Sequence, residues 1–217
     1  YSKPTFNPQR DLPPVARLVT MTNAVAVRTD SGIQNMQQLM AILKSDRKKA
    51  FYGSAGIGTS SHLTGHMFGK AMGADLTHVP YKGTGDMSMA VVGAQIDGAV
   101  TYTPFAIANR GKVRALAVAM EKRHPLMPTV PTFRELGVDW IDGAYRGVGV
   151  PRSTSPEARK KLSDMWLALN NDAEMKELAA KSGFELVNIG TDQMDAFMKE
   201  RIALYIEGAK RLGLGKK

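Results

Sequence analysis

A glycine- and hydroxyl-rich run at residues 53–62 has the composition of an anion-binding loop. The run follows a strand candidate and opens a helix, and its glycines would let the backbone approach a ligand closely. N–H groups at the start of that helix would point at an anion, helped by the helix dipole and by nearby hydroxyls. A tight turn with Ser/Thr caps explains the same pattern equally well. The candidate anion contacts in this run are Gly56, Gly58, Thr59, Ser60 and Ser61.

Known catalytic and nucleotide-binding motifs do not fit this run. Gly53 and Gly58 have the spacing of a P-loop, but Thr59 stands where the lysine should be. The third glycine of a dinucleotide fingerprint is missing, and Ser54 lacks the spacing of a nucleophile elbow. Carboxylate pairs of the glycosidase type are not discernible. The sequence therefore indicates no catalytic residue.

Two histidines of the same helix have a spacing that metal ligands use. His62 and His66 are four residues apart on one helical face. The residues between them do not include the glutamate of a zinc protease motif, and no third ligand is evident. Two helical histidines without a carboxylate are usually structural, so we expect no bound metal and no cofactor.

Polar side chains near other strand ends are further ligand candidates. Tyr81 and Lys82 end a strand and enter a glycine-containing turn, and α/β folds bind ligands at the carboxyl ends of their strands. Thr101 offers a hydroxyl at another strand end. Arg146 precedes a strand and could fork onto a carboxylate. We expect Lys82 and Arg146 to sit in turns and to balance the charge of an acidic ligand, although each also suits a plain surface position.

Short apolar runs alternate with amphipathic helical patterns along the chain, which predicts βα units and an α/β fold with a mixed, mainly parallel sheet. The strand candidates are residues 15–19, 24–27, 50–52, 76–81, 96–102, 113–119, 148–150 and 184–187. The clearest helical periodicities cover residues 36–43, 162–169, 175–182 and 194–209.

Capping signals mark the boundaries of the C-terminal helices. Ser155 and Pro156 supply a cap residue followed by a first-turn proline. Asp172 and Thr191 are expected to cap the next two helices, and Gly183 to end one of them.

The bulk composition is that of an ordinary globular protein with an excess of positive charge. Of 217 residues, 43% are hydrophobic and 23% charged, and the formal net charge is +9. This charge raises the local concentration of anions such as small carboxylates, phosphates or nucleic acid. The densest basic cluster, at residues 44–49, is expected to be a solvated helix end. The absence of cysteine excludes a disulfide framework, and no apolar stretch is long enough to span a bilayer.

An ordered set of segments resembles one known family. The first half of the chain contains residues 6–8 with 11–16, then 53–63, then the sequence HVPYKG at 78–83. The second half contains residues 111–118 with Arg123, then 128–132 and 135–137. From about Thr5 to near the C-terminus, these segments resemble the tripartite tricarboxylate transporter substrate-binding proteins, also called the Bug family. No single segment is decisive, but the ordered set is specific.

The resemblance implies a type II periplasmic-binding-protein fold, in which two α/β lobes are joined by crossing strands and a carboxylate sits in the cleft. On that template residues 27–114 form lobe 2, and residues 1–26 and 115–217 form an incomplete lobe 1. Gly56 to Ser61, Tyr81, Lys82 and the loop near Thr101 are then expected at the cleft. The resemblance also implies a periplasmic receptor without enzymatic activity. Such a receptor captures a small carboxylate for the membrane components of a tripartite transporter, binds no nucleic acid and is not embedded in the membrane.

Two departures from the family pattern bear on these expectations. Family members begin with a strand and a glycine-rich loop that helps to hold a ligand carboxylate, and this sequence starts downstream of both. We therefore expect that a further N-terminal portion, or else another chain, completes the first lobe, because its share of strands is small and the helix face around Met165 would otherwise lack a partner. Thr101 also stands where many relatives carry an acidic residue, so the identity of the ligand does not carry over.

Two other classes of protein remain as alternatives. The sensor domain of a LysR-type transcriptional regulator shares the type II binding fold and has a similar length, although no helix-turn-helix pattern precedes Asp11. An enzyme on the same fold would need a convergent set of acid, base or nucleophile residues, and none is visible. The segment at residues 78–83 favours the transport receptor.

Overall fold

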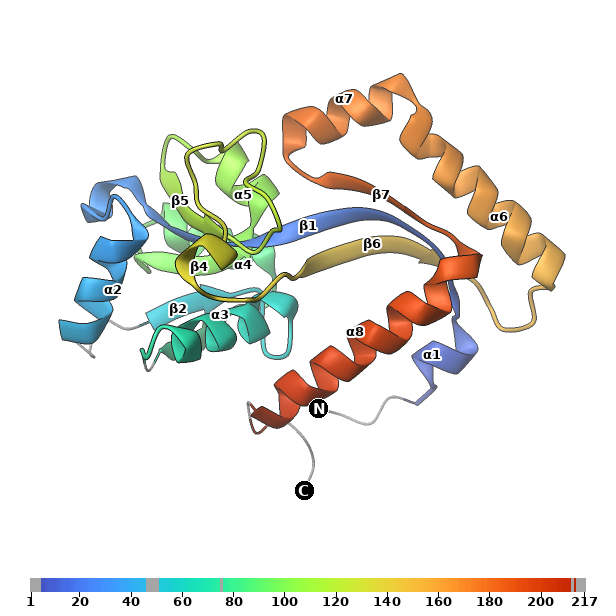
Figure 1. Cartoon of the computed structure of the whole chain (residues 1–217), viewed down its shortest axis with the longest axis horizontal. Coiled ribbons are helices and arrows are strands. Elements are labelled where there is room, and N and C mark those ends of the chain that lie inside the picture. The colour runs from blue at the N-terminus through green and yellow to red at the C-terminus, as the bar shows by residue number, and fades with distance from the viewer. Residues whose placement is uncertain (1–4, 46–50, 75, 212, 214–217) are drawn as a thin grey trace. The chain divides into compact units, whose positions relative to one another are not determined.

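The structure is a computed structural model that describes residues 5–45, 51–74, 76–211 and 213 (Figure 1). The chain divides into two compact units, which we call unit 1 (up to Thr20, and from Tyr145 onward) and unit 2 (Met21–Ala144). The lobe boundaries that the resemblance implies stay a prediction about the complete receptor. Most of the basic cluster predicted at residues 44–49 lies outside the described residues.

One long strand, β1 (Pro14–Arg28), contributes residues to both units. Its sequence is rich in β-branched residues and its burial is nearly continuous, as expected for a strand that is covered on both faces. The apolar pattern predicted two short strands here, at residues 15–19 and 24–27. The structure joins them because the intervening Thr20, Thr22 and Asn23 are themselves buried in the strand.

Unit 2 is built on a mixed sheet with the strand order β3-β2-β4-β1-β5. The strands are β2 (Phe51–Ser54), β3 (Thr77–Pro80), β4 (Gly98–Tyr102) and β5 (Val113–Val118). β2 pairs in parallel with β3 and β4, whereas β1 runs antiparallel to β4 and β5. The mixed α/β class is confirmed. Antiparallel pairing is more extensive than the alternation of strands and helices predicted, because the single long β1 opposes several neighbours.

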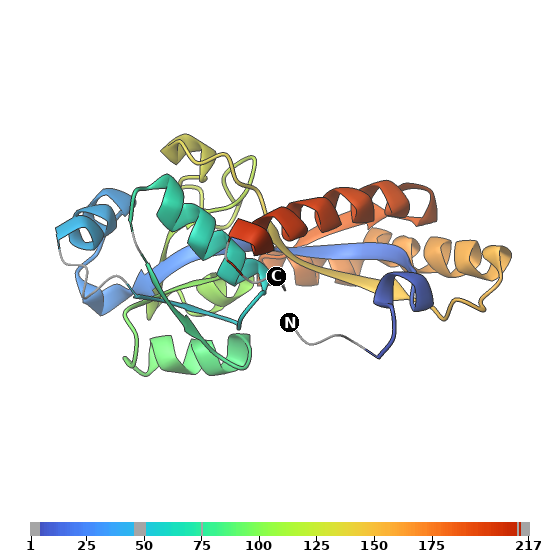
Figure 2. The ribbon, with the colours of Figure 1, turned by 90° about the horizontal axis from the view of Figure 1, so that it is seen from below.

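Helices cover both faces of this sheet (Figure 2). α3 (Ser60–Ala71) lies on the face that carries Asn23 and Tyr102, and α4 (Thr84–Val92) lies on the face that carries Ala26 and Ala99. The residues that form the core under α4 are Ala26, Met87, Val91, Ala99, Phe105 and Val113. The other helical elements of unit 2 are η1 (Thr29–Ser31), α2 (Met36–Ser45), α5 (Thr103–Ala108) and η3 (Arg134–Leu136).

Unit 1 combines three strands with the C-terminal helices. The N-terminal half of β1 pairs antiparallel with β7 (Glu185–Ile189), and β6 (Gly143–Gly149) also pairs with β1. The helical elements are α1 (Pro8–Asp11), α6 (Pro156–Ala168), η4 (Leu169–Asn171), α7 (Ala173–Ser182) and α8 (Thr191–Arg211). Asn170 fastens η4 to the strands, since its Nδ2 donates to the carbonyl oxygens of Leu18 and Val187 at 3.0 and 3.1 Å.

The capping predictions for α6 and α7 are confirmed. Ser155, which precedes the first-turn Pro156, accepts the N–H of Ala158. Asp172 accepts the N–H groups of Glu174 and Met175. Gly183 ends α7 in the left-handed conformation at φ +75°. Thr191 differs from the prediction, because it is the first residue of α8 and its N–H donates to Ser163 Oγ at 3.3 Å.

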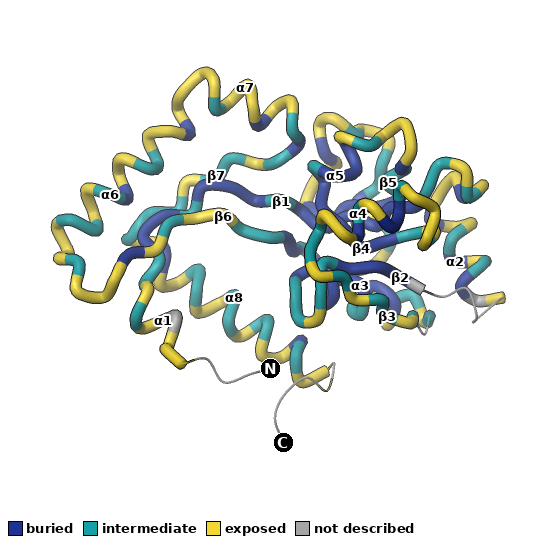
Figure 3. The backbone as a smooth tube through the Cα atoms, turned by 180° about the vertical axis from the view of Figure 1, so that it is seen from behind, coloured by how far each residue is buried: buried dark blue, intermediate teal, exposed yellow. Residues whose placement is uncertain are grey.

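Much of the helices α6, α7 and α8 of unit 1 is exposed or intermediate in burial (Figure 3), and several of the exposed residues are apolar. Met165, Leu169, Leu178 and Ile206 are all exposed. It stays a prediction that a further N-terminal portion or another chain covers these side chains. None of the described helices is both long enough and apolar enough to cross a membrane.

Candidate functional site

The predicted anion loop connects β2 to α3 in unit 2, and a network of internal hydrogen bonds holds it. Thr59 is the N-cap of α3 and accepts the N–H of His62, while its own hydroxyl donates to the Gly56 carbonyl at 2.7 Å. The Ser61 hydroxyl accepts the N–H of Ala55 at 3.1 Å and lies 3.1 Å from Thr59 Oγ1. These hydroxyls were predicted to add donors for a ligand, but the structure shows them holding the loop in shape.

Two amide groups at the start of α3 have no acceptor among the described residues. These are the N–H groups of Ser60 and Ser61, the first two residues of the helix. The N–H of Thr59, which was also predicted to be available, donates instead to the Gly56 carbonyl at 3.3 Å. Because Ser60 and Ser61 are buried, amides without an acceptor are costly there. An anion at this helix end would satisfy them.

The conformation of the loop explains its glycines. Gly56 and Gly58 have φ angles of +129° and +78°, which side chains rarely adopt. A Cβ atom on Gly56 would also lie 3.0 Å from the Tyr81 carbonyl oxygen. These two positions therefore need glycine so that the loop can pass close to the end of β3. Ile57, between them, is exposed at the tip of the loop.

A stacked pair of histidines contacts the loop. The rings of His62 and His78 are 3.8 Å apart between centroids, and their planes are inclined by 11°. His62 Nδ1 accepts the N–H of Gly58 at 3.0 Å, and His78 Nε2 lies 2.5 Å from Ser54 Oγ. Burial lowers the pKa of His78 to about 4, assisted by the nearby His62. Burial also lowers the pKa of His62, assisted by His66, so both rings are neutral at neutral pH.

His62, one of the two histidines with metal-ligand spacing, therefore has a structural role. Its ring is occupied by the stack with His78 and by the hydrogen bond from Gly58. Among the described residues, no group of three His, Asp or Glu side chains is placed to hold a metal ion. That the protein binds no metal stays a prediction.

Tyr81 lies beside the loop, and Lys82 follows it in the chain. The N–H of Tyr81 donates to the Ser54 carbonyl at 3.1 Å, which ties the end of β3 to the end of β2. The ring of Tyr81 packs against the core under α4, so it anchors the end of β3 to the interior of unit 2. Lys82 is exposed after the end of β3, and its ligand contact stays a prediction.

Thr101 lies in the interior of unit 2. It is fully buried in β4, and its Oγ1 has no partner among the described residues. The neighbouring Tyr102 lies on the α3 face, where its hydroxyl is 3.1 Å from Ser60 Oγ. Tyr102 thus connects β4 to the start of α3. The ligand contact of Thr101 stays a prediction.

Arg146 differs in position from the prediction. It lies within β6 and not in a turn before a strand, and it belongs to unit 1, whereas the loop belongs to unit 2. Because strand β6 begins at Gly143, the sequence signal at Val148–Val150 marked only its end. The Arg146 side chain is exposed, and its Nη1 donates to the Tyr145 carbonyl at 3.1 Å. Its ligand contact stays a prediction.

Sequence reasoning missed the residues that support the loop from inside the unit. Thr64 Oγ1 accepts from Asn23 Nδ2 at 2.8 Å and from Trp140 Nε1 at 2.9 Å, so three segments meet on one hydroxyl. His78 belongs to a segment that carried the family resemblance, but no pattern linked it to His62. The packing of α3 against β3 brings these side chains together.

Comparison with known proteins identifies one family. Residues 1–213 match the family described as "Tripartite tricarboxylate transporter family receptor". A UPF0065 protein encoded in the gbd 5' region of Cupriavidus necator is 29% identical over 216 residues, and this match covers 99% of the chain. Protein BugT of Bordetella pertussis is 24% identical over 207 residues, covering 94% of the chain. The chain spans 66% of the length of the first relative and 63% of the second.

Solved structures show the same fold. The periplasmic binding protein BugD has a TM-score of 0.88 at 28% identity, and the match covers all of this chain and 74% of BugD. MatC from Rhodopseudomonas palustris, solved with bound malate, has a TM-score of 0.78 at 25% identity, covering 97% of this chain and 71% of MatC. The expected fold class and family are thus confirmed, and nothing in these comparisons supports a LysR-type regulator.

Proposed function

The chain belongs to the tripartite tricarboxylate transporter receptor family, and from this premise we propose that it captures a small carboxylate. The receptor would act outside the cytoplasm, in the periplasm, and would deliver the acid to the membrane components of a tripartite transporter. It would perform no chemistry on the ligand. Binding of malate by MatC, at 25% identity, supports a carboxylate as the ligand class.

One observation in the structure carries the proposal. The N–H groups of Ser60 and Ser61 have no acceptor among the described residues, and they stand at the positive end of the 12-residue helix α3. A carboxylate oxygen accepts such N–H groups well, and each hydrogen bond to a charged group contributes on the order of 1.5–3 kcal/mol. Lys82, exposed beside the loop, supplies a nearby positive charge.

The proposed ligand contacts follow from this geometry and from the family template. The loop from Gly56 to Ser61 would provide backbone donors, and Lys82 would provide the first counter-charge. Tyr81, Thr101 and Arg146 complete the proposed set.

The ligand class can be tested with the full-length mature receptor. We would measure its thermal unfolding in the presence of mono-, di- and tricarboxylates, aromatic acids and acidic amino acids, with the corresponding amides as uncharged controls. An acid at 100 times its dissociation constant should add about 2.7 kcal/mol to the free energy of unfolding. Stabilisation by amides and acids alike, or by none of the acids, would contradict the proposal.

The location of the site needs its own test. The variant Lys82→Ala should weaken binding of the acid found in the screen, and Lys70→Ala, at the far end of α3, should not. Because the loop contributes backbone groups, Gly58→Ala at φ +78° should also weaken binding by distorting it. A ligand-bound structure in which the loop faces away from the acid would exclude this site.

A further inference from the structure

A groove on unit 2 is lined by segments that the proposed ligand loop does not use. Its volume is about 990 Å3, and its walls come from the start of α2, the end of α5, β5 and residues 123–136. We call it the arginine groove and define it by six of its lining residues: Arg110, Arg114, Leu126, Met127, Val130 and Leu136. It includes most of the segments of the second half of the chain that carried the family resemblance.

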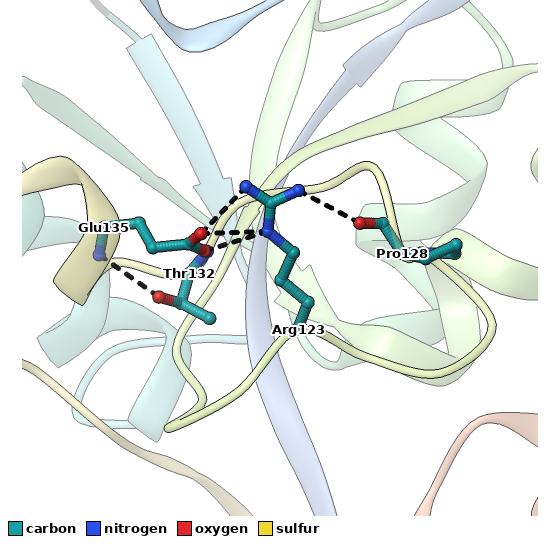
Figure 4. Close-up of polar contacts among 4 residues, drawn as sticks. All are labelled: Arg123, Pro128, Thr132 and Glu135. Atoms are coloured by element: carbon teal, nitrogen blue, oxygen red, sulfur yellow. Dashed lines mark hydrogen bonds and ion pairs between the residues drawn. The ribbon is translucent and has the colours of Figure 1, made fainter.

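One wall of the groove is a loop locked by a forked ion pair (Figure 4). Arg123 donates to Glu135 through Nε at 3.0 Å and Nη2 at 2.8 Å, and its Nη1 donates to the Pro128 carbonyl at 3.1 Å. Glu135 Oε2 also accepts the N–H of Thr132 at 2.7 Å. Because both charged side chains are about half exposed, the pair contributes little to global stability. Its geometry instead gives the proline-containing loop a fixed shape.

The same wall presents apolar side chains on a firm base. Met127 and Val130 pack against the buried Ala24, Val118 and Met120. Leu126, next to them, is exposed. The groove therefore offers a preformed apolar surface whose position the core of unit 2 determines.

The charges that line the groove are unbalanced. Glu135 is neutralised by Arg123. Arg110 is exposed and has no ion-pair partner among the described residues. Arg114 Nη1 donates to the Ile33 carbonyl at 2.8 Å, and it too has no carboxylate partner in the described part of the chain. Two guanidinium groups thus lie beside an apolar wall without counter-charges.

We propose that the arginine groove is the docking site for an acidic segment of the transporter's membrane component, with carboxylates on Arg110 and Arg114 and apolar side chains on the wall of Met127 and Val130. This inference rests on the proposed function as a transport receptor. Charge complementarity favours an acidic partner, since guanidinium groups match carboxylates in a bidentate geometry. A second copy of this chain is disfavoured because each copy carries a formal net charge of +9.

The test measures docking separately from ligand capture. Full-length receptor would be bound to phosphatidylcholine vesicles that contain the transporter's membrane components, with empty vesicles of the same lipid as reference. Arg110→Glu should weaken this binding about ten-fold or more, the loss expected for one charge-assisted contact. Arg114→Gln provides a second, milder variant, because Arg114 also supports the Ile33 carbonyl. Affinity for the acid, measured on the same preparations, should stay within about two-fold.

Lys122→Glu is the matched control, because Lys122 is exposed in the same unit, outside the groove, and undergoes the same change of charge. It should leave docking unchanged. Docking of Arg110→Glu and Arg114→Gln at the parent affinity would overturn the proposal, as would equal binding to empty vesicles. Failure of the parent receptor to bind any acid would count against the proposed function, but the vesicle measurement would still decide whether the groove docks the membrane component.

Discussion

The ring of His78 lies face to face with the ring of His62, so that two histidines from different elements form one stack under the candidate loop. His62 comes from α3 and His78 from β3. His62 Nδ1 accepts the Gly58 N–H, and this hydrogen bond requires that nitrogen to be unprotonated. The shape of the loop is therefore coupled to the neutral form of a histidine pair. Tyr52 and His66 are titratable groups near the stack.

We predict that stability falls as the pH drops from about 6.5 toward 4. Burial lowers the pKa of folded His78 to about 4, while the unfolded chain has the ordinary value of about 6.5. Between these values only the unfolded state takes up the proton, so protonation favours unfolding. Each such proton lowers the free energy of unfolding by at most about 1.4 kcal/mol per pH unit. Urea unfolding at pH 7, 6, 5 and 4 measures this slope.

The variant His78→Gln isolates the contribution of His78. Glutamine keeps a polar atom near Ser54 but does not titrate, so the slope of stability against pH should decrease in the variant. His124→Gln is a comparison variant, because His124 is also buried but lies outside the stack. An unchanged slope in His78→Gln would show that other groups cause the pH dependence.

The position of Gly65 illustrates what the sequence could not reveal. A Cβ atom there would lie 2.1 Å from Cε2 of Tyr52, whose hydroxyl donates to the His62 carbonyl at 3.1 Å and whose ring is buried. We expect Gly65→Ala to destabilise the protein by about 1–3 kcal/mol, because the buried and hydrogen-bonded ring would have to shift. Gly85→Ala, in α4, meets no atom within 4 Å and should be neutral or stabilising by about 0.5–1 kcal/mol. Thermal unfolding of the two variants compares them directly, and equal effects would contradict the clash.

Patterns that are local in the chain were predictable, and contacts between distant segments were not. The caps at Ser155 and Asp172 lie within three residues of the groups they bind, so their chemistry is visible in the sequence. By contrast, the stack of His62 on His78 depends on the packing of α3 against β3, and no periodicity encodes it. The single long β1 was divided in two because buried Thr and Asn residues resemble a loop in an apolar pattern.

The candidate site shows the same limit. Its glycines and its helix start were predictable because turn geometry and helix capping are local properties. Which N–H groups remain without an acceptor was not predictable, since Thr59 N–H is taken by Gly56 and the Ser61 hydroxyl by Ala55. That distribution depends on the folded path of the whole loop.

The ion pair of Arg123 and Glu135 leads to a prediction about local motion. In Glu135→Gln the forked charge interaction is lost, so amide hydrogen exchange at Thr132 should become faster while global stability changes little. The Arg123 guanidinium holds the pKa of Glu135 at about 2, so the same loosening should appear in the parent protein only as the pH falls toward that value. Glu121→Gln, an exposed carboxylate nearby, is the control. Exchange at Thr132 that is unaffected by Glu135→Gln would show that the ion pair does not fix the loop.

The last prediction concerns the hydroxyl of Thr64, which is fully buried and accepts hydrogen bonds from Asn23 Nδ2 and Trp140 Nε1. Thr64→Val preserves the shape of the side chain but leaves two buried donors without an acceptor. Each unsatisfied donor costs about 1–3 kcal/mol, so with two such donors the free energy of unfolding should fall by about 2–6 kcal/mol. Thr64→Ser keeps the acceptor and loses one methyl group, which should cost about 1 kcal/mol. Urea unfolding of both variants decides the matter, because a valine variant as stable as the serine variant would mean that these hydrogen bonds contribute nothing net to the fold.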